Sequence, residues 1–188
     1  MRRIDQLPAT AHGGGVMSMI HTLNWYRRHH IEHPDLALWP RAAAVTRDDV
    51  TIASESMTGM ARAVGTPCTR VSESAARSWS MAAGDRHCAI VVTAVEAVTI
   101  SPDGDGYDLW VDAELDGCEP LESTFRLIGR QSRAQDALFV ARPCRRYGDL
   151  QCVLPVDIHA GDLVAFVIAR PVALHDIRRR SQHPERLY

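Results

Sequence analysis

Short runs of apolar and β-branched residues alternate with turn signals through residues 88–174. The runs cover residues 90–100, 107–115, 124–128, 138–141, 150–158 and 163–172. Turns rich in glycine and aspartate separate them, for example at 102–106 and 160–162. Strands at such regular spacing are typical of antiparallel sandwiches and barrels, not of an α/β enzyme core. We therefore expect a mainly β protein, an antiparallel β-sandwich of the jelly-roll or immunoglobulin-like type.

The chain of 188 residues is long enough for one domain with an N-terminal elaboration. Pro8 and three successive glycines predict an extended arm over residues 1–16. Residues 17–33 carry apolar side chains at helical spacing and end before Pro34, which predicts a helix. We expect four parts, namely the arm (1–16), a helix and hairpin elaboration (17–84), the sandwich core (85–175) and a basic tail (176–188).

Two segments of the elaboration carry further predictions. Residues 42–45 and 50–53 are apolar and flank a polar turn, so they predict a β-hairpin. Residues 72–83 fit a helix capped by Ser72 and a strand equally well, because small polar residues alternate there with larger ones.

Two of the predicted strands differ in their patterns. Both faces of residues 163–168 are apolar, which is typical of a central strand covered on both sides. In residues 107–115 one face is apolar, and the other carries Trp110 among three carboxylates: Asp108, Asp112 and Glu114. We expect this second face to be wet and acidic, with Trp110 exposed as a contact point for a partner.

The composition excludes some classes of function. The net charge of −2 gives no overall attraction to nucleic acid or to an anionic membrane. All 21 basic residues are arginine, which indicates a GC-rich coding sequence of a bacterium or phage. We find neither a signal peptide nor an apolar run long enough to span a bilayer, so we expect a cytoplasmic protein without a membrane partner. The five cysteines form no CxxC pair and are expected to be small buried side chains.

A histidine stripe is the strongest candidate for metal chemistry. His21, His29 and His33 share one face of the predicted helix with Trp25, and Glu32 lies beside them. Imidazoles one turn apart can bind a divalent transition metal. A second possible metal pair is His87 with His159, each at the start of a predicted strand.

Arginines gather at two places. Arg142, Arg145 and Arg146 surround a predicted turn, and Arg178, Arg179 and Arg180 open the basic tail. If they converge in space, they form an anion-binding patch for phosphate, nucleic acid or an acidic protein. Few aromatic residues lie near them, which disfavours the recognition of single-stranded bases.

No complete catalytic signature is present, so we expect a non-enzymatic binding or interaction protein without a cofactor, most readily one with a protein partner. The expected contact residues are Trp110, Asp108, Asp112, Trp25, Arg142, Arg145, Arg146, Arg178, Arg179 and Arg180. A metal-dependent enzyme built on the histidine stripe is the first alternative. A nucleic-acid or phosphate binder acting through the arginines is the second.

Overall fold

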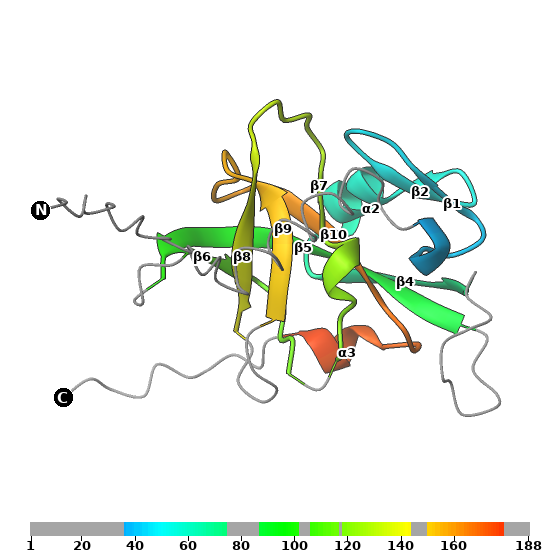
Figure 1. The fold of residues 1–188 in the computed structure, drawn as a ribbon. Helices are drawn as coiled ribbons and strands as arrows, with labels where there is room; N and C mark the ends of the chain where they lie inside the picture. The colour runs from blue at the N-terminus through cyan, green and yellow to red at the C-terminus, as the bar shows by residue number, and fades with distance from the viewer. Residues whose placement is uncertain (1–35, 75–86, 102–105, 117, 144–149, 179–188) are drawn as a thin grey trace, which may run out of the picture. The chain divides into compact units, whose positions relative to one another are not determined.

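A computed structural model describes residues 36–74, 87–101, 106–116, 118–143 and 150–178 (Figure 1). All of them belong to one unit, His33–Tyr188. The predicted arm and the predicted helix at 17–33 lie outside the described residues, as does most of the segment 72–83.

Strands dominate the described part of the chain. Its elements are η1 (Leu36–Leu38), β1 (Ala43–Val45), β2 (Val50–Ile52), β3 (Glu55–Ser56), α2 (Met57–Val64), β4 (Cys68–Glu73), β5 (His87–Ile100), β6 (Tyr107–Val111), η2 (Glu122–Thr124), β7 (Arg126–Ile128), β8 (Asp136–Arg142), β9 (Leu150–Pro155), β10 (Leu163–Ile168) and α3 (Leu174–Ile177). Each of the six predicted apolar runs contains a strand, so the prediction of a mainly β protein is confirmed. The predicted hairpin is confirmed as β1 and β2.

The larger sheet has the strand order β7-β10-β5-β6-β8-β9, and β4 also pairs with β5. The long strand β5 pairs with β4 and β10 through its first half and with β6 through its second half. At the far end of this order β9 lies beside β7 and η2, so the sheet curls nearly into a barrel. A sandwich is therefore not confirmed.

The expectation of an antiparallel arrangement is wrong for one pair, because β6 and β8 run parallel from Tyr107↔Phe139 to Trp110↔Arg142. A parallel pair needs a long connection, and here residues 112–135, which include η2 and β7, supply it.

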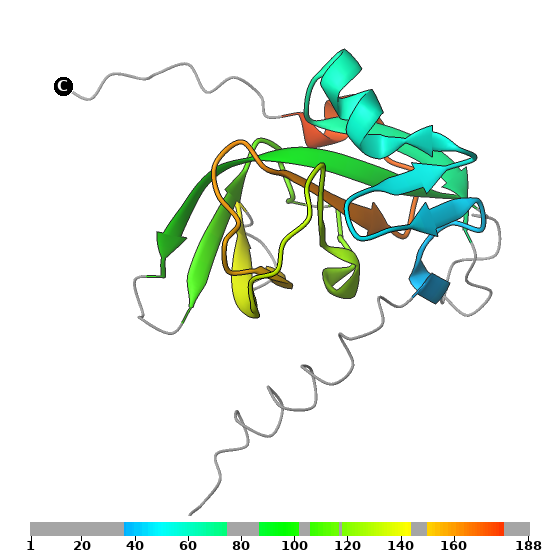
Figure 2. The same ribbon diagram turned by 90° about the horizontal axis from the view of Figure 1, so that it is seen from above.

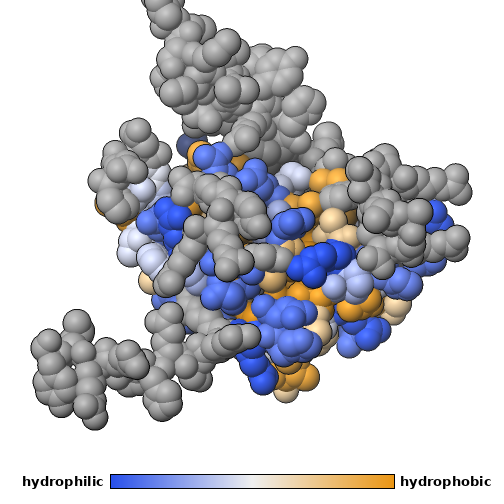
Figure 3. All heavy atoms as spheres, turned by 90° about the horizontal axis from the view of Figure 1, so that it is seen from below, coloured by the Kyte–Doolittle hydropathy of each residue, from blue (hydrophilic) through white to orange (hydrophobic). Residues whose placement is uncertain are grey.

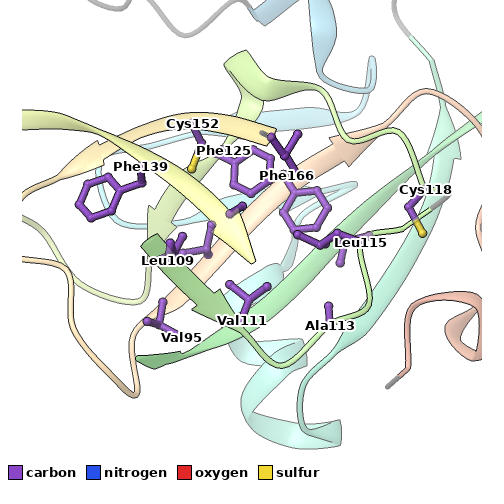
Figure 4. Close-up of a cluster of buried hydrophobic side chains, with 14 of the residues drawn as sticks. Val95, Leu109, Val111, Ala113, Leu115, Cys118, Phe125, Phe139, Cys152 and Phe166 are labelled. Carbon is purple, nitrogen blue, oxygen red and sulfur yellow. The ribbon is translucent and has the colours of Figure 1, made fainter. Parts of the chain in front are cut away.

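The interior of the curled sheet is filled by one apolar cluster (Figure 4). Alternate residues of each strand point inward, as the two-residue period of a strand requires. Phe125 and Phe166 stack there with ring centroids 4.5 Å apart, and Tyr107 packs against Phe139. Leu109 and Val111 of β6 are fully buried in this cluster, as the pattern of residues 107–115 predicts.

The outer face of β4, β5 and β10 is covered by a second apolar cluster. Trp39, Met57 and Ala61, with β2, pack there against β5 and against Ala165 and Val167 of β10. Strand β10 is thus buried on both faces, which confirms its prediction as a central strand. Figures 1 and 2 show α2 and the β1–β3 sheet on the opposite side of the molecule from β6 and β8.

Helix α2 begins at a point fixed by side-chain hydrogen bonds. Ser56 is its N-cap and accepts from Gly59 N at 2.9 Å. Asp49 in turn accepts from the Ser56 hydroxyl and from both the backbone N–H and the hydroxyl of Thr58. At the other end Gly65 has φ +83°, a conformation that glycine adopts without steric cost, and its N–H bonds to Ala61 O.

Among the described residues, no helix combines the length and the apolar character needed to cross a membrane.

Candidate binding surface

Trp110 and Arg142 are neighbours on the outer face of the curled sheet. They are register partners in the parallel β6–β8 pair, and paired residues share a face. Trp110 as a residue is 37% exposed, and its Nε1–H donates to Thr99 Oγ1 at 3.2 Å. Arg142, whose side chain is 25% exposed, ends β8 beside it. The fold therefore brings together two candidate contact residues that lie 32 positions apart in the sequence.

Asp108 completes this cluster from a buried position. It lies two residues before Trp110 on the same face of β6, yet it is only 5% exposed. Its Oδ1 is 3.4 Å from Arg142 Nε, but no hydrogen bond reaches that oxygen from any described residue. Alternation along a strand shows which face of the sheet carries a residue, but it does not show whether that residue is exposed to solvent. The expectation that Asp108 is solvent-exposed is therefore wrong.

Apolar side chains extend the same face across β8 and β9. Leu138 pairs with Val153, and Val140 lies opposite Asp108. These three apolar residues are half-buried, and none belongs to or packs against either apolar cluster. We call the outer face formed by Trp110, Arg142, Asp108, Leu138, Val140 and Val153 the Trp110 face.

Carboxylates border the Trp110 face at the end of β6. Glu96 is exposed and forms a bulge where β5 pairs with β6. Asp112 is half-buried, and its Oδ1 accepts from Ala94 N at 2.9 Å. Glu114 is also half-buried, with Oε1 accepting from Asp116 N. A carboxylate has about four lone-pair sites, so the single hydrogen bonds that Asp112 and Glu114 accept do not exhaust theirs.

Exposed apolar residues also occur elsewhere on the surface. Figure 3 shows an apolar area, interrupted by hydrophilic residues, on the face seen from below. Val64 and Ile100 are more exposed than Trp110. Because isolated apolar side chains are normal on protein surfaces, the exposure of Trp110 alone does not identify a binding surface. What distinguishes Trp110 is its combination with a neighbouring arginine and a row of half-buried apolar side chains.

The other predicted contact residues divide into two groups. Arg178 is described and exposed, and it bridges to Ala113 just beyond β6. The remaining residues lie outside the described part of the chain, namely Trp25, Arg145, Arg146, Arg179, Arg180 and the candidate metal ligands His21, His29 and His33.

The second candidate metal pair does not come together. His87 opens β5, whereas His159 lies in the turn that bonds to Val95 through Gly161. Val95 is eight positions after His87 along β5, which corresponds to about 26 Å. Within the described ranges, no group of three or more histidine, cysteine or acidic residues is arranged to hold a metal ion.

A polar cluster around Arg130 was not predicted from the sequence. Arg130 binds both carboxylate oxygens of Asp162 and also contacts Asp157, which accepts from the Ser132 hydroxyl. The sequence of residues 160–162 indicates the turn itself, because aspartate after glycine is common in turns. Nothing in the sequence indicated which arginine would reach it.

The described cysteines are unsuited to nucleophilic chemistry. Cys68, Cys88, Cys118 and Cys152 are buried and free. Burial raises the pKa of the Cys68 and Cys88 thiols to about 11, and it also raises the pKa of Cys118 and Cys152. The thiolate is the reactive form, so these residues are inert at neutral pH.

Comparison of the sequence with protein-family models and with characterised proteins found no match.

Proposed function

We propose that this chain is a non-enzymatic binding protein that contacts a protein partner through the Trp110 face. The observation that carries the proposal is the pairing of an exposed Trp110 with Arg142 on β6 and β8. Tryptophan and arginine are the side chains most enriched among the energetically dominant residues of protein interfaces.

The composition of the face supports this proposal. Half-buried Leu138, Val140 and Val153 supply an apolar centre, and Glu96 and Asp112 supply a polar rim. An apolar centre inside a polar rim is the usual anatomy of an interface. The buried carboxylate of Asp108, 3.4 Å from Arg142 Nε, favours this position of the arginine, which lowers the entropy lost when a partner binds.

The test is a comparison of full-length tagged variants as bait in a lysate of the source organism, with quantitative mass spectrometry. Trp110→Ala and Arg142→Ala are the test variants. Val64→Ala is the matched control, because Val64 is exposed on α2 and lies away from β6 and β8. We expect at least one protein to be captured by the wild type and by Val64→Ala. The amount of this protein captured by Trp110→Ala should be at least tenfold lower, which corresponds to about 1.4 kcal/mol of binding free energy. Equal capture by all four baits contradicts the proposal.

A further inference from the structure

The C-terminal segment leaves the described fold at the acidic end of β6. Arg178 forms an antiparallel bridge with Ala113, and Glu114 N donates to Ile177 O at 2.8 Å. Because the bridge is antiparallel, the chain at Arg178 runs opposite to β6, in the direction that leads from Ala113 back toward Trp110.

The distance to the Trp110 face is short compared with the length of chain available. Trp110 lies three residues before Ala113, about 10 Å along an extended strand. Residues 179–188 follow Arg178 in the sequence, and ten residues can span about 33 Å. The segment is therefore long enough to cover the whole width of β6 and its neighbours.

The segment is basic, whereas the border of the face is acidic; on the face itself Arg142 lies beside the buried Asp108. Residues 179–188 contain three arginines and one glutamate. Glu96, Asp112 and Glu114 border the face near the point where the segment begins. A guanidinium also stacks favourably on an indole ring, and Trp110 presents an exposed indole.

We propose that residues 179–188 dock in cis on the Trp110 face, with their arginines against Trp110 and the neighbouring carboxylates. The segment then competes with the partner for this face. That regulatory consequence rests on the proposed function, whereas the docking itself does not.

The docking is tested by NMR of the full chain, with the Trp110 indole N–H as the probe. That resonance is assigned by its loss in Trp110→Phe. The test variant is Arg179→Glu/Arg180→Glu. The control is Arg41→Glu/Arg47→Glu, which changes the charge equally at exposed positions on the β1–β2 side of the molecule. Unchanged melting temperatures show that the variants are folded. If the test variant is not folded, Arg179→Gln/Arg180→Gln replaces it.

We expect the Trp110 indole resonance to shift in the test variant and to stay in place in the control. Raising the salt concentration to about 1 M should move the wild-type resonance toward that of the test variant, because salt screens the attraction. The position should not depend on protein concentration. If the Trp110 indole resonance does not shift when Arg179 and Arg180 are substituted, the docking is overturned. A concentration-dependent resonance also overturns it, since the occupant is then the tail of a second copy.

The two proposals fail in different experiments. If the segment occupies the face two thirds of the time, the test variant captures partner with about threefold higher apparent affinity. An indole shift without any effect of Trp110→Ala on capture supports the docking and contradicts the proposed function. Loss of capture with Trp110→Ala, but no indole shift in the arginine variant, supports the proposed function and contradicts the docking.

Discussion

Arg130 binds the carboxylate of Asp162 through two parallel hydrogen bonds, from Nε and Nη2, each 2.7 Å long. Nη2 of Arg130 also donates to the backbone oxygen of Asp157 at 2.9 Å. The segment that follows β7 is thus fixed to the turn between β9 and β10. Asp162 is 6% exposed, so removal of Arg130 leaves a buried carboxylate without its cation.

We expect Arg130→Ala to lower the free energy of unfolding by about 2–4 kcal/mol, measured by urea denaturation at pH 7. Arg130→Lys should recover only part of this loss, because an ammonium group cannot make the bidentate pair. Arg133→Ala, an exposed neighbour, is the control and should stay within about 0.5 kcal/mol of the wild type. A loss in Arg133→Ala as large as that in Arg130→Ala refutes this account.

The same pair predicts a pH dependence. Burial tends to raise the pKa of Asp162, but hydrogen bonds from Arg130 and from the backbone of His159 hold it below its ordinary value. A carboxyl with a lowered pKa stabilises the fold above its unfolded pKa of about 3.9, and this stabilisation is lost as the pH falls through the folded value. The difference between wild type and Arg130→Ala should therefore be largest at neutral pH and shrink as the pH falls, because the buried carboxyl is protonated first in the variant, which lacks the arginine, and then in the wild type. If the stability difference between the two proteins instead grows as the pH falls, this prediction is wrong.

The sequence predicts the strands of this fold well because each strand has a local signature. Alternation along residues 107–115 identifies Leu109 and Val111 as core residues, and the double apolar face of residues 163–168 identifies a central strand. Both properties follow from the two-residue period of a strand. The hairpin of β1 and β2 is likewise local, since its strands are joined by a four-residue turn.

What the sequence does not predict depends on contacts between distant residues. The parallel pairing of Trp110 with Arg142 and the approach of Arg130 to Asp162 each join residues 32 positions apart. Alternation places Asp108 with Trp110 but gives no sign that Asp108 is buried. The candidate surface was therefore predicted as separate residues, and only the fold shows that Trp110, Asp108 and Arg142 belong together.

Asp49 provides a second stability prediction, at the start of α2. It accepts hydrogen bonds from Val50, Ser56 and Thr58. We expect Asp49→Ala to cost about 2–3 kcal/mol in thermal or urea unfolding, since several donors lose their acceptor together. Asp49→Asn keeps one acceptor oxygen and should cost about half as much. Asp48→Ala, at an exposed neighbouring position, is the control.

The effect of Asp49 should also depend on pH. Burial tends to raise its pKa, but the hydrogen bonds from Ser56 and Thr58 outweigh this and lower it. The stabilisation is therefore present above about pH 4 and lost as the pH falls further. Because an asparagine side chain does not titrate, the gap between the wild type and Asp49→Asn should close in acid. A gap that is unchanged down to pH 2 contradicts this prediction.

Thiol labelling tests the burial of the cysteines. In a Cys144→Ser variant the four remaining cysteines are all buried, and burial raises the pKa of each. We expect no reaction with an aromatic disulfide reagent at pH 8 in the native state, and reaction of all four thiols in guanidinium chloride. Rapid labelling of one native thiol, located by peptide mass mapping, shows that its strand opens or that its burial is wrong.

The last prediction separates the surface role of Trp110 from a structural one. Phe139 lies on β8 opposite Tyr107, in the same β6–β8 pair as Trp110, but its side chain is fully buried in the interior of the curled sheet. Phe139→Ala should cost about 3–5 kcal/mol, as is usual for the removal of a buried phenylalanine. Trp110 is 37% exposed and makes one hydrogen bond, to Thr99, so Trp110→Ala should cost no more than about 1–2 kcal/mol. Urea denaturation of the two variants provides the comparison. If Trp110→Ala destabilises the protein as much as Phe139→Ala does, its loss of partner binding reports unfolding and not a binding surface.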